Sequence, residues 1–67
     1  MEPHEGGIYY NGGIPYYQIV RVLEGGSLRL KALDDGAEIN YKHKMMLHYG
    51  YELREAGEYT SYEDEEI

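Results

Sequence analysis

The sequence predicts a small all-β domain with a single core, on three observations. Residues 16–41 hold three short runs in which apolar and polar side chains alternate, the pattern of half-buried strands. Glycine-containing turns separate these runs, as expected for hairpins. The chain has 67 residues and no Cys, so it is one domain, and neither disulfides nor thiolate-bound metals reinforce its core.

The middle run gives the clearest strand. Leu28, Leu30 and Ala32 fall on one side of a period-two repeat, whereas Arg29 and Lys31 fall on the other. The alternation predicts a strand with its leucines in the core and its basic side chains in solvent.

The first run, residues 16–23, is largely apolar on both faces, which is typical of a strand in the middle of a sheet. Strict alternation divides it into two sets. One set is Tyr16, Gln18, Val20 and Val22, and the other is Tyr17, Ile19, Arg21 and Leu23.

The third run places Ala37, Ile39 and Tyr41 inward, with polar residues between them. Glu24-Gly25-Gly26 precedes the middle run and Asp34-Asp35-Gly36 precedes the third. Both segments are suited to tight turns, and we expect Gly36 to need a positive φ angle. The three runs form a meander.

Short elements flank the meander. Residues 8–10 form a first strand that ends at Asn11-Gly12-Gly13, a strong hairpin signal. Met45, Met46 and Leu47 are consecutive apolar residues, which favours one helical turn. Gly50 ends this turn, and residues 51–54 resume the alternation as a closing strand.

This order of elements resembles small SH3-like β-barrels over about residues 8–54. The residues that carry the resemblance are Gly36 and Ile39, the turn Met45-Met46-Leu47, and Tyr51 with Leu53. OB-like and other five-stranded barrels share the pattern in part. The resemblance implies a five-stranded SH3-like barrel over residues 8–56, with a flexible N-terminus at 1–7 and an acidic tail at 57–67. It also implies a binding module rather than an enzyme, although the absence of Trp argues against proline-rich peptides as ligands.

The net charge of -7 is unevenly distributed. Residues 50–67 contain seven acidic side chains and the single base Arg54, a balance of -6, whereas residues 1–49 are almost neutral. The acidic end is either a solubilising terminus or a surface that engages a basic partner. The second interpretation predicts a non-enzymatic protein-interaction module. The acidic surface could inhibit a nucleic-acid-binding protein by imitating phosphates in its binding groove. In this respect the chain resembles, in type, small acidic inhibitors encoded by phages. The predicted partner-binding residues are Glu58, Tyr59, Tyr62, Glu63, Asp64, Glu65, Glu66, Tyr17 and Tyr49.

Nine tyrosines with no Phe or Trp are the most unusual feature of the composition. Tyrosine suits binding surfaces because it offers a large contact area and a hydroxyl, but it can also fill a small core. We expect Tyr16, Tyr41 and Tyr51 in the core. The tyrosines expected to be at least partly exposed are Tyr9, Tyr10, Tyr17, Tyr49, Tyr59 and Tyr62.

The alternative functions receive less support. A nucleic-acid-associated barrel would use a basic strip made of Arg29, Lys31, Lys42 and Lys44 with Arg21, but the acidic end would repel phosphate. No catalytic residues, cofactor or metal site are predicted, because His4, His43 and His48 lack ligand spacing and no nucleophile motif is present. Neither a leader nor a membrane-spanning run is recognisable, which leads us to expect a cytoplasmic protein without membrane contact.

Overall fold

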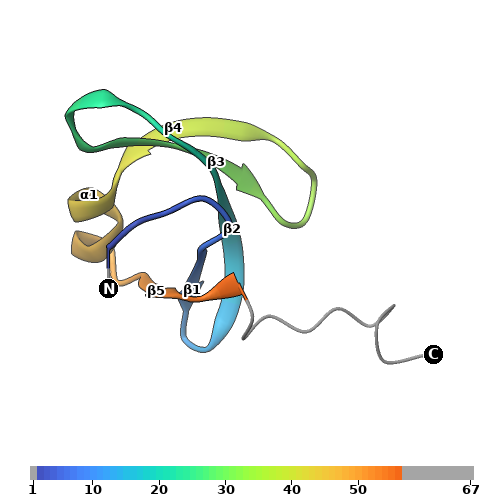
Figure 1. The fold of residues 1–67 in the computed structure, drawn as a ribbon. Coiled ribbons are helices and arrows are strands. Elements are labelled where there is room, and N and C mark those ends of the chain that lie inside the picture. Colours follow the sequence, from blue (N-terminus) through green and yellow to red (C-terminus); the bar gives the residue numbers. More distant parts are fainter. Residues whose placement is uncertain (1, 57–67) are drawn as a thin grey trace.

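The computed structural model describes residues 2–56, which form one antiparallel sheet and one short helix (Figure 1). The elements are β1 (Ile8–Asn11), β2 (Ile14–Val22), the 3-10 turn η1 (Glu24–Gly26), β3 (Ser27–Ala32), β4 (Glu38–Lys42), α1 (His43–His48) and β5 (Glu52–Arg54). The predicted class, mostly β with one helical turn, is confirmed. In this part of the chain no helix has the length and apolar character needed to cross a membrane.

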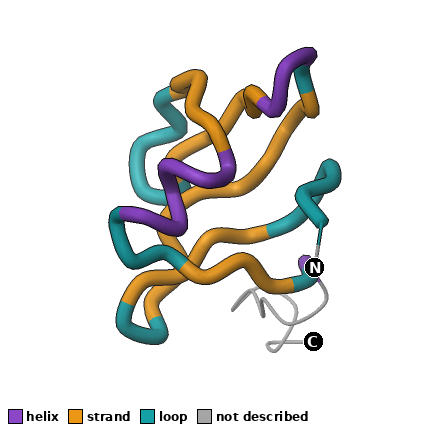
Figure 2. Tube along the Cα trace, turned by 90° about the vertical axis from the view of Figure 1, so that its left-hand side faces the viewer, coloured by secondary structure: helices purple, strands orange, loops and turns teal. Residues whose placement is uncertain are grey.

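The strand order is β4-β3-β2-β1-β5, with β2 in the middle as predicted. β4 and β5 are the two edges, so the sheet is open and does not close into a barrel. The sheet is strongly curled, and α1 lies between its two edges at the near side of the view in Figure 2. Since the short β5 pairs only with β1, no ladder joins it to β4 in the described residues.

One face of the sheet, here called the core face, carries the hydrophobic core. Its buried side chains are Tyr9, Ile19, Leu28, Leu30, Met46 and Leu53. Leu28 and Leu30 are inside while Lys31 is exposed, which confirms the register predicted for β3. Met46 is the one buried residue of α1, so the helix covers the core through this side chain.

The inward residues of β4 lie on the predicted side but are not buried. Ile39 pairs with Leu30 and Tyr41 pairs with Leu28, so both belong to the core face. They nevertheless remain 38% and 37% exposed, because β4 is an edge strand with β3 as its only described neighbour. The prediction that Tyr41 lies in the core is therefore wrong.

Two irregularities in β2 break its alternation. Tyr9 pairs with Tyr17 and Tyr10 with Pro15, which leaves Tyr16 without a partner on β1. Val20 likewise has no partner on β3. Such bulges bend a strand and redirect its side chains. Beyond the second bulge, Val22 pairs with Leu28 and belongs to the core face, so the strict two-set division of this strand is wrong.

The turn before β4 forms as the sequence predicts. Gly36 has a φ of 79°, the left-handed region that glycine enters without a steric penalty. The backbone N–H of Gly36 donates to the carbonyl of Ala32 at 2.9 Å, and the Asp35 carboxylate accepts from the N–H of Ala37 at 2.9 Å. These bonds fix the hairpin between β3 and β4.

The segment before β1, predicted as a flexible end, is hydrogen-bonded to β2. The N–H of Gly6 donates to the carbonyl of Ile19, and the N–H of Ile19 donates to the carbonyl of Gly7, both at 2.8 Å. Gly7 is buried, and a Cβ at this position would lie 3.0 Å from Leu53 Cδ1. Glycine lets this backbone approach the core closely, whereas a larger residue would have to displace the Leu53 side chain.

Candidate functional site

Five tyrosines gather where β2, β4 and the turn after α1 meet, and they form what we call the tyrosine cluster. Its members are Tyr16, Tyr17, Tyr41, Tyr49 and Tyr51. The rings of Tyr16 and Tyr17 both lie 5.9 Å from that of Tyr51, with edge-to-face geometry. The rings of Tyr41 and Tyr49 stack at 6.0 Å with an interplanar angle of 17°. These distances are typical of favourable aromatic pairs.

Three separate elements bring the cluster together. The bulge in β2 leaves Tyr16 unpaired beside Tyr17, so consecutive residues both contact Tyr51. β4 contributes Tyr41. The turn after α1 contributes Tyr49 and Tyr51, whose N–H groups donate to carbonyls of the helix at 3.1 and 3.0 Å. The backbone thus holds both residues against α1.

The cluster is open to solvent. Tyr16, Tyr41 and Tyr49 are 42%, 37% and 51% exposed, whereas Tyr17 and Tyr51 are half-buried against the core. The predicted exposure of Tyr17 and Tyr49 agrees with this arrangement. The prediction that Tyr16 is a core residue is wrong, because the bulge turns it out of the regular ladder.

Two members of the cluster, Tyr41 and Tyr51, have raised pKa values. Tyr49 is the main cause of the raised pKa of Tyr41, and nearby Tyr17 adds to it. Burial is the main cause of the raised pKa of Tyr51, followed by Tyr17 and Tyr16. Tyr41 and Tyr51 are therefore neutral at physiological pH, and their hydroxyls can both donate and accept hydrogen bonds.

Tyr9 and Tyr10, predicted to be partly exposed, are buried instead. Tyr9 lies on the core face between β2 and β5, and is fully enclosed. Tyr10 lies on the opposite face, where the guanidinium of Arg54 sits 4.6 Å from its ring centroid. β1 has a neighbouring strand on each side, which is why its tyrosines are less accessible than those near the sheet edge.

Tyr9 forms a hydrogen bond with a histidine 34 positions further along the chain, a contact that no sequence pattern predicts. Its hydroxyl lies 2.7 Å from Nδ1 of His43 at the start of α1. We assign the hydroxyl as donor, which places the ring proton on Nε2. Burial raises the pKa of Tyr9 to about 12, and burial also lowers the pKa of His43.

The other two histidines lie elsewhere. His4 Nε2 forms an exposed ion pair with Glu55 at 3.2 Å, and His48 lies edge-on to Tyr49 at 5.6 Å. Within residues 2–56, no group of three or more His, Cys, Asp or Glu side chains could hold a metal ion.

Basic residues gather on the face of the sheet opposite the core, the outer face. Strand pairing assigns five of the six Lys and Arg residues to it: Arg21, Arg29, Lys31, Lys42 and Arg54. Arg21 pairs directly with Arg29, whose Nε lies 3.5 Å from the Glu38 carboxylate. The structure therefore places four members of the predicted basic strip on one face of the sheet, while the fifth, Lys44, is separate on α1.

Most of the predicted partner-binding residues lie outside the described part of the chain. These are Glu58, Tyr59, Tyr62, Glu63, Asp64, Glu65 and Glu66. In comparisons with protein-family models, curated proteins and solved structures, nothing matches this chain.

Proposed function

We propose that this chain is a non-enzymatic protein-interaction module, and that its tyrosine cluster binds cationic side chains on a macromolecular partner. The observation that carries the proposal is the cluster itself: five neighbouring tyrosines, of which Tyr16, Tyr41 and Tyr49 are each more than one-third exposed. Solvated apolar area of this kind is characteristic of contact surfaces when it is gathered in one place.

The chemistry of the cluster favours a basic partner. The face of an aromatic ring carries negative electrostatic potential and attracts guanidinium and ammonium groups. The rings of Tyr41 and Tyr49 are nearly parallel, and both residues are more than one-third exposed, so part of their aromatic surface is open to a cationic side chain. Neutral hydroxyls around these faces can accept hydrogen bonds from Arg or Lys side chains of the partner.

The net charge supports the same class of partner. A charge of -7 attracts positively charged surfaces over a range of about a Debye length, ~8 Å at physiological salt. The acidic residues of positions 58–66 would add steering to the contacts that the cluster makes. A partner that uses its basic surface to bind nucleic acid would be inhibited, because the acidic chain would compete with phosphates for that surface.

The β4 edge offers a second means of attachment. Every residue of β4 is exposed, and within residues 2–56 the strand pairs only with β3. An edge of this kind can pair with an extended segment of another protein, which would place that segment beside Tyr41.

We also propose that the open sheet is a variant of SH3-like architecture, since four strands, a helical turn and a last short strand follow one another in the order of such barrels.

The proposal is tested with an arginine-rich peptide as the basic probe. Its affinity for wild-type protein is compared with that of two double variants, Tyr41→Leu/Tyr49→Leu and Tyr41→Phe/Tyr49→Phe, by fluorescence anisotropy. Leucine removes the aromatic faces, whereas phenylalanine keeps them. We expect the leucine variant to bind several-fold more weakly and the phenylalanine variant to retain most of the affinity. Equal binding by all three proteins would reject the cluster as the contact surface.

The pairing of Arg21 with Arg29 supports a second candidate, a nucleic-acid-associated protein. Like charges placed directly opposite each other on neighbouring strands are destabilising, and a bound phosphate would relieve their repulsion. This candidate predicts salt-dependent retention on heparin, lost in an Arg21→Ala/Lys31→Ala variant. The first candidate predicts retention on an anion exchanger only.

A further inference from the structure

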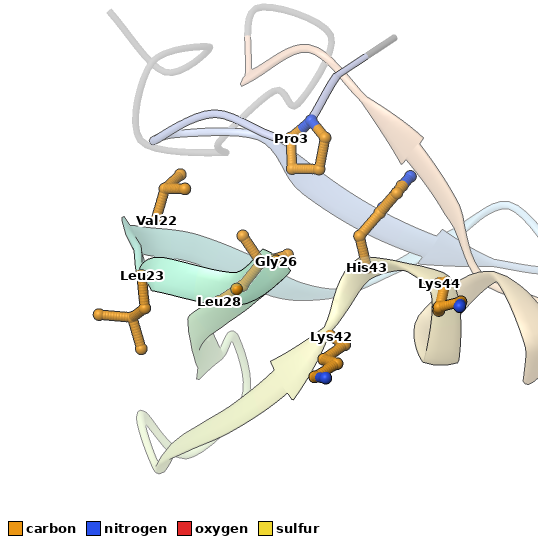
Figure 3. A pocket seen from close by; sticks show the side chains of 9 residues that line it. Pro3, Val22, Leu23, Gly26, Leu28, Lys42, His43 and Lys44 are labelled. Carbon is orange, nitrogen blue, oxygen red and sulfur yellow. The ribbon is translucent and has the colours of Figure 1, made fainter.

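A pocket opens between the end of the β2–β3 hairpin and the start of α1 (Figure 3). Val22 and Leu28 line it from the two strands, and Pro3 lines it from the N-terminal segment. Its cavity volume of about 470 Å³ is within the range of small-molecule sites. Leu28 is fully buried while Val22 is about half exposed, so the pocket reaches from the core to solvent.

The polar part of the pocket is basic, although the protein is acidic. Lys42, His43 and Lys44 line it, and no carboxylate side chain from residues 2–56 does. Neither lysine takes part in the ion pairs found among residues 2–56. His43 Nδ1 is occupied by the Tyr9 hydroxyl, which leaves the Nε2 proton free to donate.

We propose that this pocket binds a small amphipathic anion, a carboxylate with an aliphatic or aromatic body. The body of the ligand contacts Val22 and Leu28, and the carboxylate lies beside Nε2 of His43. The side chains of Lys42 and Lys44 point to different sides of the pocket in Figure 3, and both are flexible enough to turn toward the bound carboxylate. An apolar recess next to ammonium groups that form no ion pair within residues 2–56 matches both halves of such a ligand. The recess buries the body, and the ammonium groups neutralise the carboxylate. The pocket shares no residue with the tyrosine cluster, so this proposal does not depend on the proposed function.

Octanoate is a suitable probe, with 1-octanol as a neutral analogue of equal chain length. In a ¹H–¹⁵N NMR titration, octanoate should shift the amide signals of Gly26, Leu28 and His43, and raise the pKa of the His43 ring. A Lys42→Met/Lys44→Met variant should bind about tenfold more weakly. An Arg21→Met/Lys31→Met variant loses the same charge on the outer face and should bind like wild type.

A third variant, Val22→Glu, places a carboxylate in the pocket at a position exposed enough to be tolerated. It should abolish octanoate binding while the amide spectrum away from the pocket is preserved. The proposal is overturned if 1-octanol binds as tightly as octanoate, if the two lysine substitutions leave the affinity unchanged, or if octanoate shifts no signal from the pocket.

Discussion

The hydroxyl of Tyr9 lies 2.7 Å from Nδ1 of His43, and this hydrogen bond connects β1 to the start of α1. Tyr9 is fully buried and His43 is partly so. In the described residues no buried side-chain polar atom lacks a hydrogen-bond partner, and this bond satisfies the one polar atom that Tyr9 brings into the core. Its loss should therefore be measurable.

Tyr9→Phe removes the donor and leaves His43 Nδ1 without its partner. We expect the free energy of unfolding to fall by about 1 kcal/mol, as measured by urea denaturation. Tyr49→Phe, which removes a hydroxyl from an exposed ring, is the control and should leave stability within about 0.5 kcal/mol of wild type. Equal stability of the two variants would mean that the bond to His43 makes no contribution.

Two histidines should titrate on opposite sides of their ordinary pKa of 6.5. Burial lowers the pKa of His43, whereas the Glu5 backbone and the Glu55 carboxylate raise the pKa of His4. NMR titration of the ring signals should give midpoints in that order. A midpoint for His43 at or above that of His4 would contradict the packing of α1 on the core.

The same shifts have opposite effects on stability. Below about pH 6.5 the unfolded chain binds a proton at His43 more readily than the folded chain, so stability contributed by this residue is lost as pH falls. The contribution of His4 is present at low pH and is lost as pH rises through its folded pKa. In a His4→Gln protein, unfolding free energy should therefore decline between about pH 7 and pH 5. A further His43→Gln substitution should flatten that decline.

Adjacent residues of β3 should respond very differently to truncation. Leu30 is completely buried, so Leu30→Ala should cost ~2–5 kcal/mol and unfold much of so small a domain. Lys31 is exposed on the outer face, and Lys31→Ala should change the melting temperature little. Thermal unfolding followed by circular dichroism distinguishes the two. Similar effects of both substitutions would contradict the register of the sheet.

Gly36 is required for its backbone conformation rather than for space. A Cβ added there would lie no closer than 3.8 Å to any neighbouring side chain, the Lys31 Cε, yet the φ angle is 79°. Gly36→Val should therefore cost at least about 1–2 kcal/mol, and Gly36→Asn should cost less because Asn tolerates this region. Denaturant midpoints for the two variants check the order, and equal losses would point to a steric cause instead.

The sequence predicted elements whose signals are local. β3 follows from strict alternation, the hairpin at Gly36 from its turn residues, and α1 from consecutive apolar residues at 45–47. Each of these features depends on side chains within a few positions of one another. Local patterns were therefore enough to place the strands, the turns and the helix.

The positions of the tyrosines could not be predicted because they depend on pairing between distant segments. The bulges at Tyr16 and Val20 appear only when β2 is matched with its neighbours. The exposure of Tyr41 follows from the place of β4 at an edge, and the burial of Tyr9 from strands on both sides of β1. Alternation gives the side of a strand only where no bulge interrupts it, and it does not give how much of that side is covered.

The most direct test of the proposed function is an NMR titration of the wild-type protein with an arginine-rich peptide, followed at the tyrosine ring signals. We expect the rings of Tyr16, Tyr41 and Tyr49 to shift together, whereas the buried Tyr9 stays in place. These shifts should persist in a protein with Glu63, Asp64, Glu65 and Glu66 changed to Gln, although at higher peptide concentration, because the acidic residues steer the encounter and the rings make the contact. Shifts confined to residues 58–66, with the rings of the cluster unchanged at saturation, would contradict the account.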